Sequence, residues 1–347
     1  MRNIEVHPSV TFGLSVYSNV FLCHIILKAY MKSAFKLGLL YMYGAFGVAR
    51  TEQKVAAYEG VMSLAARLAR LQVCTAQVEG QTMAYFDNQR AGQPVVLFVH
   101  GFTGDKENWL MVAPKLTRDF RLIAVDLLGH GASDKPLEGD YSVTAQARRL
   151  GALLHQLGIV RPVHVVGNSM GGLIAGYFAA LFPEMTQTVT FIDNAGMPVQ
   201  NAFSEQVRVE FVEGRCPLIP EKVEDLDGLE ALIWHKKVKA PRFLREALIE
   251  KKFPDRAVYF SVLKAMTIDG LIGFREPLID VLPKIKAPVM IMWGKEDRVI
   301  SVDVVGEMLK CIQAQKVVVY EQVGHVPMVE APRETARDLK AFFEHNR

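Results

Sequence analysis

Short apolar runs alternate with segments of helical spacing from residue 72 to the end of the chain. The runs are continuous and rich in β-branched residues, as strands buried on both faces are. They are Val95–Val99, Leu122–Val125, Val163–Val166, Val189–Ile192, Val289–Trp293 and Val317–Tyr320. The segments with helical spacing are Asn108–Leu116, Thr144–Leu157, Gly172–Leu181 and Val302–Ile312. This alternation predicts an α/β fold with a mostly parallel sheet flanked by helices. Gln72–Val78 and Met83–Phe86 predict an antiparallel hairpin at one sheet edge.

One connection in this pattern is far longer than the others. The segment between Asn194 and Pro288 greatly exceeds the roughly 2–6 residues of an ordinary βα connection. It is rich in large apolar side chains and predicts an inserted helical cap over residues 197–282. The core is then made of residues 72–196 and 283–347, and residues 1–71 form a separate N-terminal segment.

The N-terminal segment carries two apolar runs. Val6–Leu27 contains no Asp, Glu, Lys or Arg and exceeds the roughly 18 residues of a membrane-span candidate, although serines and a histidine interrupt it. Leu37–Ala49 is shorter and follows a cluster of three lysines. These runs predict a hydrophobic helical segment that associates with a membrane. The alternative is two buried helices of an N-terminal extension.

The side of the membrane stays open at this point. If Val6–Leu27 spans the bilayer, Lys28, Lys32 and Lys36 lie inside and the rest of the chain is cytoplasmic. If translation begins at Met31, the lysines precede the apolar run and the chain is exported. The stretch Val55–Leu71 has a broad apolar helical face, which favours either a helix docked on the core or one lying in the membrane interface.

Charge and cysteine content exclude several classes of protein. Lys+Arg 40 against Asp+Glu 37 gives a net charge of +3, too near balance for a nucleic-acid-binding surface. The composition, 50% hydrophobic and 22% charged, is that of a packed globular protein rather than a disordered chain. The four cysteines are widely separated, so they predict neither a zinc site nor a disulfide framework. We expect no cofactor, no metal ion and no nucleic-acid partner.

The segment Gly167-Asn168-Ser169-Met170-Gly171-Gly172 follows a predicted strand and leads into an apolar helix. This is the G-x-S-x-G pattern in the context of a nucleophile elbow, where a strained turn needs small neighbours on both sides of the serine. The pattern predicts that Ser169 is a nucleophile. The alternative is an ordinary glycine-rich start of a helix.

A serine hydroxyl needs a base and a carboxylate that orients the base. Asp297 follows one predicted strand and His325 follows the next, so both emerge at the same sheet edge as Ser169. The order Ser, Asp, His along the chain fits a Ser169–His325–Asp297 triad. Glu296 and Asp193 are the competing acids, which we interpret as a solvated neighbour and a strand-end cap.

A third element, His100-Gly101-Phe102, follows the strand Val95–Val99. An oxyanion hole requires two backbone N–H donors, one from the residue after the nucleophile and one from such a loop. Met170 and Phe102 are therefore the predicted donors.

With these motifs in place, residues 72–347 resemble the α/β-hydrolase superfamily. The segments HGFTGDKENW, GNSMGG, WGKEDRV and GHVPMVE, with a hydrophobic N-terminus, are similar to those of membrane-bound monoacylglycerol lipases and bacterial cell-bound lipases. The resemblance implies a serine hydrolase that cleaves monoacylglycerols or similar lipid esters through an acyl-enzyme. Glu330 stands where related acyltransferases carry Asp, which makes acyl transfer less favoured.

Two other functions compete with ester hydrolysis. Carbon–carbon bond hydrolases of the meta-cleavage type share the G-N-S-M-G-G elbow, but their oxyanion loop usually reads Gly-Pro-Gly after His-Gly, which is absent here. A ligand-binding protein without catalysis could retain the same fold. The intact set of Ser169, Asp297 and His325 argues against that alternative, because binding needs no activated nucleophile.

Overall fold

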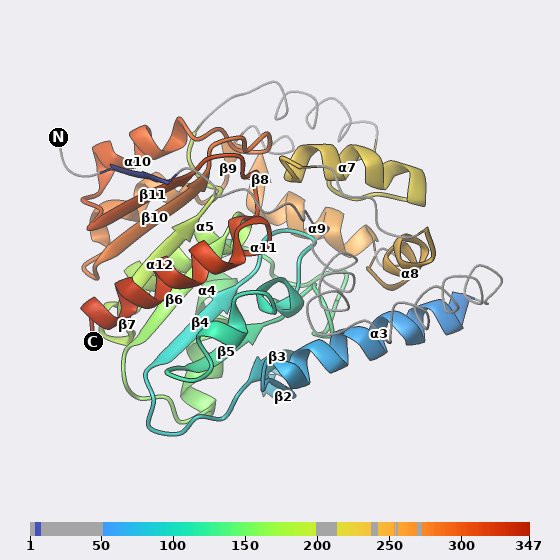
Figure 1. Cartoon of the computed structure of the whole chain (residues 1–347), viewed down its shortest axis with the longest axis horizontal. Helices are drawn as coiled ribbons and strands as arrows, with labels where there is room; N and C mark the ends of the chain where they lie inside the picture. Colours follow the sequence, from blue (N-terminus) through green and yellow to red (C-terminus); the bar gives the residue numbers. More distant parts are fainter. Residues whose placement is uncertain are drawn as a thin grey trace.

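The computed structural model describes residues 4–7, 51–198, 214–236, 242–252, 254, 256–268 and 273–347. Across these ranges a nine-stranded sheet runs through the molecule in the order β1-β11-β10-β7-β6-β4-β5-β3-β2 (Figure 1). The strands of this sheet are β1 (Ile4–His7), β2 (Gln72–Val78), β3 (Gln81–Asp87), β4 (Val95–Val99), β5 (Arg121–Val125), β6 (Val163–Asn168), β7 (Thr186–Ile192), β10 (Val289–Gly294) and β11 (Lys316–Tyr320).

All neighbouring strands from β1 to β5 in this order run parallel. The antiparallel pairs of this sheet both involve β3, which pairs with β5 on one side and with β2 on the other. The predicted mostly parallel sheet and its edge hairpin are thus confirmed. Because parallel strands all end at the same edge, the loops that follow β4, β6, β7, β10 and β11 meet there.

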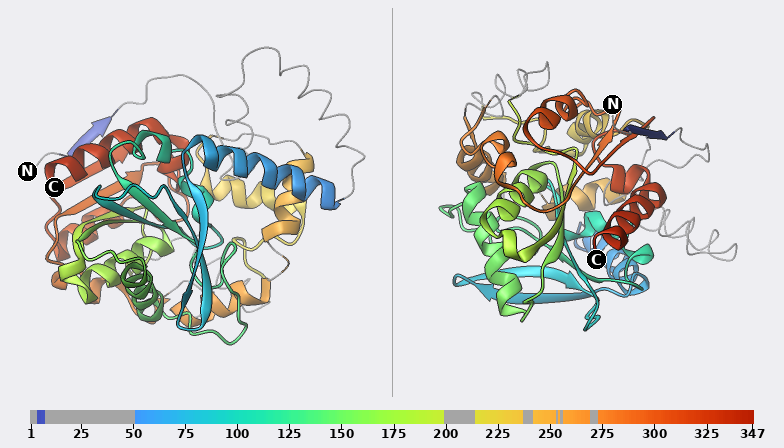
Figure 2. Two further views of the ribbon diagram at one scale, coloured as in Figure 1. Left: turned by 90° about the horizontal axis from the view of Figure 1, so that it is seen from below. Right: turned by 90° about the vertical axis from the view of Figure 1, so that its left-hand side faces the viewer.

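Helices cover both faces of the sheet (Figure 2). Those outside the predicted cap are α3 (Thr51–Leu68), α4 (Val143–Gln156), α5 (Met170–Leu181), α10 (Val304–Cys311), α11 (Pro327–Glu330) and α12 (Pro332–His345). One face carries α4, α5 and α10, whose apolar side chains form a single buried cluster with the sheet. A second cluster on the other face includes residues of α3 and α12.

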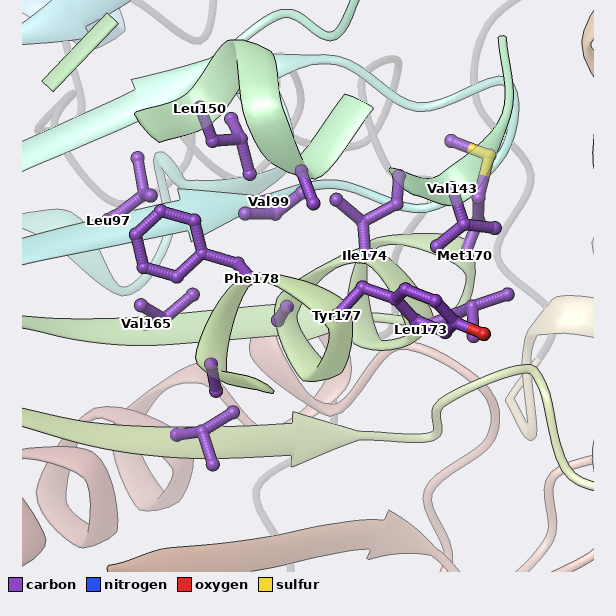
Figure 3. Close-up of a cluster of buried hydrophobic side chains, with 14 of the residues drawn as sticks. Leu97, Val99, Val143, Leu150, Val165, Met170, Leu173, Ile174, Tyr177 and Phe178 are labelled. Atoms are coloured by element: carbon purple, nitrogen blue, oxygen red, sulfur yellow. The ribbon is translucent and has the colours of Figure 1, made fainter. Parts of the chain in front are cut away.

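Strand β4 shows why its apolar run is continuous. Val96 and Phe98 belong to the cluster on one face, whereas Leu97 and Val99 belong to the cluster on the other. Side chains alternate between the two faces of a strand, so a strand covered on both faces must be apolar at every position. Figure 3 shows part of the cluster that includes α4, α5 and α10, in which side chains of α5 pack near Leu97 and Val99.

The prediction of an α-helix over Asn108–Leu116 is wrong. Two short 3-10 turns, η1 (Lys106–Trp109) and η2 (Ala113–Lys115), occupy this stretch. Pro114 lies in the first turn of η2. A proline lacks the N–H that an uninterrupted α-helix would need there, so the chain starts a new turn.

The predicted cap contributes short elements over the carboxyl ends of the strands. In the described residues these are η4 (Val223–Asp225), α7 (Leu226–Ile233), α8 (Arg242–Lys252), α9 (Arg256–Met266), β8 (Thr267–Ile268), β9 (Gly273–Phe274), η5 (Leu278–Asp280) and η6 (Leu282–Lys284). Strands β8 and β9 pair with each other alone, as a small antiparallel ribbon. Figure 1 shows α7, α8 and α9 gathered at one end of the sheet.

Helix α3 docks on the protein through one face. Tyr58, Met62 and Ala65 are buried, and the Tyr58 hydroxyl donates a hydrogen bond to Glu107 Oε2 at 3.0 Å. Lys54 Nζ forms an ion pair with Glu246 Oε2 of α8 at 2.6 Å. Of the two positions considered for this helix, the structure places it against the core and the cap.

The predicted membrane-associating runs fall largely outside the described residues. Val6 and His7 belong to β1 at the sheet edge, whereas residues 8–27 and the run Leu37–Ala49 are not described. None of the helices in the described part of the chain combines the length and the hydropathy that a bilayer crossing requires.

Candidate active site

Ser169 lies on the turn between β6 and α5. Its backbone angles, φ 55° and ψ −121°, fall in a region that side-chain-bearing residues seldom adopt. A Cβ added to Gly167 would lie 2.1 Å from the Gly171 carbonyl oxygen, and one added to Gly171 would lie 2.2 Å from that of Val99. The turn therefore forms only with glycine at both positions, as the elbow pattern predicts.

Asp297 and His325 come together from the loops after β10 and β11. The Asp297 Oδ2 and His325 Nδ1 atoms are 2.7 Å apart. The other carboxylate oxygen, Oδ1, accepts hydrogen bonds from the N–H groups of Val299 and Ile300 at 2.8 and 3.0 Å. Asp297 thus holds the ring so that Nε2 is the nitrogen left to take up a proton.

Ser169 and His325 line the same hollow, described below, but no hydrogen bond joins them in the described structure. The structure therefore brings two of the three predicted residues into direct contact and sets the third beside them. Hydrogen bonds between such groups are often long before a substrate binds.

The predicted oxyanion donors lie on two adjoining segments. Met170 is the first residue of α5, so its N–H has no partner within the helix. Phe102 follows Gly101, and a Cβ added to Gly101 would come within 3.0 Å of the Ser169 Cβ. This close approach brings the loop after β4 next to the nucleophile elbow. The positive end of the α5 dipole points to the same place.

Asn168 was not among the predicted site residues. Its Nδ2 donates hydrogen bonds to the carbonyl oxygens of Ile192, at 3.1 Å, and His325, at 3.2 Å. One side chain therefore ties the elbow to the end of β7 and to the histidine loop. In the sequence, the only feature that pointed to Asn168 was its position directly before Ser169. That position does not show whether the side chain forms such hydrogen bonds or faces solvent.

Two acids on the neighbouring loops also hold the histidine loop. Glu296, interpreted above as a solvated neighbour, accepts a hydrogen bond from the Val323 N–H at 2.9 Å. Glu330 accepts one from the Gly324 N–H at 2.7 Å and one from the His235 N–H at 3.0 Å. Burial raises the pKa of Glu330 to about 7, although these backbone donors act in the opposite direction.

The end of α7 is attached to these same loops. The His325 N–H donates to the Ile233 carbonyl oxygen at 2.9 Å. Arg298, next to Asp297, donates to the carbonyl oxygens of Ala231 at 2.8 Å and Trp234 at 3.4 Å. These bonds satisfy carbonyl groups that the end of a helix leaves without partners. They also connect α7 directly to the loops that carry Asp297 and His325.

Asp193 lies beside Asp297 and His325, and one potential ligand atom of each residue lies within 4.8 Å of the others. Ligands of a tetrahedral zinc ion are about 3.3 Å apart at the usual bond lengths. The 2.7 Å separation of the Asp297 and His325 atoms is instead that of a hydrogen bond. The cluster is thus a hydrogen-bonded array rather than a coordination shell.

Two further buried histidines, His100 and His164, have structural partners. His100 Nε2 accepts a hydrogen bond from the Leu127 N–H at 3.1 Å, and its Nδ1 lies 2.8 Å from the Gly101 carbonyl oxygen. His164 Nδ1 contacts the Thr188 hydroxyl at 2.9 Å. Burial lowers the pKa of His164 to about 4, so this ring is neutral at pH 7.

Two hollows meet at Ser169 and Phe102. The apolar chamber has about 810 Å³ of empty space, open solvent included, and its wall includes Leu173, Met197, Leu263, Met266 and Phe274. The second chamber has about 720 Å³ on the same measure. We call it the polar chamber because it is the more polar of the two: its wall includes Thr103, Asn108, Asn168 and His325, although apolar side chains such as Ile233 form most of it. In the described part of the chain, no Asp, Glu, Lys or Arg lines either chamber.

Comparison with known proteins identifies the family. A family model described as the alpha/beta hydrolase fold matches residues 94–332. Lipase 1 of Psychrobacter immobilis is 33% identical over 264 residues, which cover 76% of this chain and 81% of that protein. Monoacylglycerol lipase abhd6-B of Xenopus laevis is 30% identical over 256 residues, 72% of this chain and 75% of that protein.

A solved structure agrees with these relatives. The crystal structure of a membrane phospholipase A, described as a bacterial virulence factor, superimposes with a TM-score of 0.77 at 34% sequence identity. The match covers 90% of this chain and 99% of that chain. The sheet order, the elbow at Ser169 and these matches lead to one conclusion: the chain belongs to the α/β-hydrolase family.

Proposed function

We propose that this chain hydrolyses monoacylglycerols through an acyl-enzyme formed on Ser169. The chain is a carboxylic ester hydrolase, since it shares the α/β-hydrolase fold and about a third of its residues with lipases along most of its length. The observation that carries the finer proposal is the place of Ser169, at the junction of two chambers and beside a histidine held by a buried carboxylate.

The proposed chemistry uses groups already in position. His325 Nε2 takes the Ser169 hydroxyl proton as the oxygen attacks the ester carbon, and the oxyanion binds the N–H groups of Met170 and Phe102. The same proton then passes to the leaving alcohol. A water molecule, deprotonated by His325, releases the fatty acid and restores Ser169. Asp297 supports the imidazolium in both halves of the reaction.

The two chambers suggest how a monoacylglycerol lies in the site. The acyl chain fits the apolar chamber, because aliphatic side chains such as Leu173, Leu263 and Met266 form its wall. The glycerol fits the polar chamber, whose wall includes Asn108. We assign the amide of this residue to a glycerol hydroxyl, because a few polar groups in a binding site fix the orientation of the ligand.

Hydrolysis of phospholipids is the second candidate, favoured by the 34% identity to the membrane phospholipase A. Recognition of a phosphate group usually relies on Arg or Lys. The described residues that line the two chambers include neither. We therefore place the neutral glycerol ester first.

The test compares substrates and one substitution in the full-length protein. Ser169→Ala should lower hydrolysis of both monoacylglycerol and p-nitrophenyl butyrate by about 10⁴-fold or more, and should abolish labelling by a fluorophosphonate. Ser63→Ala, which changes an exposed serine on α3, is the matched control and should keep full activity. Undiminished turnover by Ser169→Ala would overturn the proposal, and a preference for phosphatidylcholine vesicles would favour the second candidate.

We also propose that residues 1–71 associate the protein with a membrane, which would place the enzyme next to lipid substrates. The apolar runs of the sequence and the similarity to a membrane phospholipase A support this proposal. Recovery of the full-length protein in the membrane fraction after a high-salt wash is the expected result. Protease protection in intact cells would then give the side of the membrane. Recovery in the supernatant would contradict the proposal.

A further inference from the structure

Asp193 is a second buried carboxyl beside Asp297 and His325. It directly follows β7, and its side chain has no solvent exposure. The hydrolytic steps proposed above do not use it. Burial of an isolated ionised carboxyl in a protein interior is strongly unfavourable. Its presence here, within 4.8 Å of the acid and the base, therefore needs an explanation in terms of its protonation state and its partners.

The two carboxyls differ in the hydrogen-bond donors that face them. Asp297 has three, the Val299 N–H, the Ile300 N–H and His325 Nδ1. Asp193 has one, the Gly294 N–H, which lies 2.9 Å from Oδ1. No donor in the described structure faces Asp193 Oδ2. The surroundings therefore support a negative charge on Asp297 and leave Oδ2 of Asp193 without support for one.

The negative charges near Asp193 also favour its protonated form. Burial raises the pKa of Asp193 well above its usual range, and the adjacent Asp297 raises it further. The more distant Glu330 has the same effect, whereas the Gly294 N–H lowers the pKa. Two buried carboxyls this close hold one proton between them.

The backbone at Asp193 is also unusual. Its φ of 43° lies in the left-handed region, which only a few per cent of residues other than glycine adopt. Its N–H nevertheless donates to the Met292 carbonyl oxygen at 3.1 Å, so the turn is held by β10. Strained conformations of this kind persist where the surrounding structure fixes them, and they concentrate at functional sites.

We propose that Asp193 is a positioning residue that stays protonated, donates a hydrogen bond from Oδ2 to the Asp297 carboxylate, and supports His325 itself when the Asp297 carboxyl is removed. The proposal rests on the ester hydrolysis proposed above. In the native enzyme the proton stays on Asp193 throughout turnover, and its hydrogen bond fixes the orientation of Asp297 toward His325 Nδ1.

The first experiment separates a neutral Asp193 from a charged one. Asp193→Asn keeps a donor in the same place, so kcat should fall only about threefold, whereas Asp193→Ala should lower it about 30-fold, the range for loss of a hydrogen bond to a charged group. The acid limb of the kcat/KM profile against pH should not move in Asp193→Asn, because the two residues carry one negative charge before and after the change. A shift of that limb to lower pH would show a charged Asp193 and overturn the proposal.

The second experiment tests the reserve role. Removal of the triad carboxylate typically costs about 10⁴-fold in kcat. We expect Asp297→Ala to lose about 100-fold, because the space left by the carboxyl lets Asp193 ionise and reach His325 directly or through water. The double variant Asp297→Ala with Asp193→Asn should lose at least a further tenfold. Equal activity of the double variant and Asp297→Ala would overturn the proposal.

Controls keep these results distinct from failure of the proposed function. All rates are taken relative to an active wild type and to Ser169→Ala, so absence of wild-type turnover rejects the hydrolase and not the role of Asp193. Asp338→Asn changes another buried carboxyl, which accepts a hydrogen bond from the Tyr320 hydroxyl at 2.9 Å and does not contact Asp297 or His325, and it should leave the acid limb unmoved. Thermal unfolding curves confirm that each variant is folded.

Discussion

The predicted core and the predicted cap of this protein are built in different ways. In the core, all five residues of β4 are buried and adjoining strands extend the apolar clusters on both faces of the sheet. In the cap, a small cluster unites Cys216, Ile219, Tyr259 and Leu263, and it is completed by Val299 from the loop after β10. The core thus carries Ser169, Asp297 and His325, whereas the predicted cap depends on the core for part of its packing and is hydrogen-bonded to the core loops through α7.

This difference assigns separate tasks to the two regions. Ser169, Asp297 and His325 all emerge from core loops, so a change there should affect every ester alike. The wall of the apolar chamber includes Leu263 and Met266 of α9, so a change there should alter which acyl chains fit. Variants that change the acyl-chain preference without changing the overall rate, or the reverse, test this division between the two regions.

The largest expected effect comes from filling the apolar chamber. Leu263→Trp places a larger side chain in its wall and should lower kcat/KM for monoacylglycerols of twelve or more carbons by about 100-fold, within the range for steric discrimination in hydrophobic pockets. Hydrolysis of p-nitrophenyl acetate should fall less than about threefold. Leu309→Trp, an exposed position on α10, is the control. Equal losses on both substrates would show that the cap also positions the reacting groups.

A smaller effect is expected at the polar chamber. Asn108→Leu removes the buried amide that we assign to a glycerol hydroxyl, while keeping a side chain of similar size. The ratio of monoacylglycerol to p-nitrophenyl ester hydrolysis, for the same acyl chain, should fall about tenfold, the value of one or two hydrogen bonds. Asn108 lies on η1, which belongs to the core. The measurement therefore tests whether the core, as well as the cap, contributes to substrate preference. An unchanged ratio would mean that Asn108 of the core does not bind the alcohol part of the substrate.

The smallest effect concerns the stability of the core. Burial beside Phe120 and Phe343 lowers the pKa of His164 to about 4. Between pH 6.5 and pH 4 this histidine is therefore protonated in the unfolded chain and neutral in the folded protein. This contribution to stability is complete above pH 6.5 and is lost as the pH falls toward 4. Urea unfolding should give a free energy about 1 kcal/mol lower at pH 5 than at pH 6 from this group. His164→Gln should remove that difference, and an unchanged slope in the variant would contradict the assignment.

The core and the place of the site could be predicted from sequence because each rests on a local pattern. Strands covered on both faces must be apolar throughout, which located β4, β6, β7, β10 and β11 to within a few residues. The elbow was located by the glycines at 167 and 171, which allow its turn to form. The exact type of the turns at η1 and η2 was not predicted, since Pro114 and the packing around Trp109 override the helical spacing.

The contacts that organise the site were less predictable because they join distant parts of the chain. Asn168 and Glu296 were not distinguishable from solvated polar residues by sequence alone. Glu330 showed only a departure from an acyltransferase pattern, and nothing in the sequence linked it to the backbone of His235. Asp193 was recognised as a competing acid, yet its missing donor at Oδ2 is visible only in three dimensions.

The attachment of α7 to the loops of Asp297 and His325 limits how a lipid can enter. Displacing the end of this helix would break the hydrogen bonds that Glu330, Arg298 and the His325 backbone make with it, and would disturb the base. The other side of the cap also packs firmly, because Leu244 and Ala247 of α8 are buried in the same apolar cluster as Tyr58 and Met62 of α3. A substrate that entered by displacing α7 would therefore lose the base it needs, so entry has to leave this attachment intact.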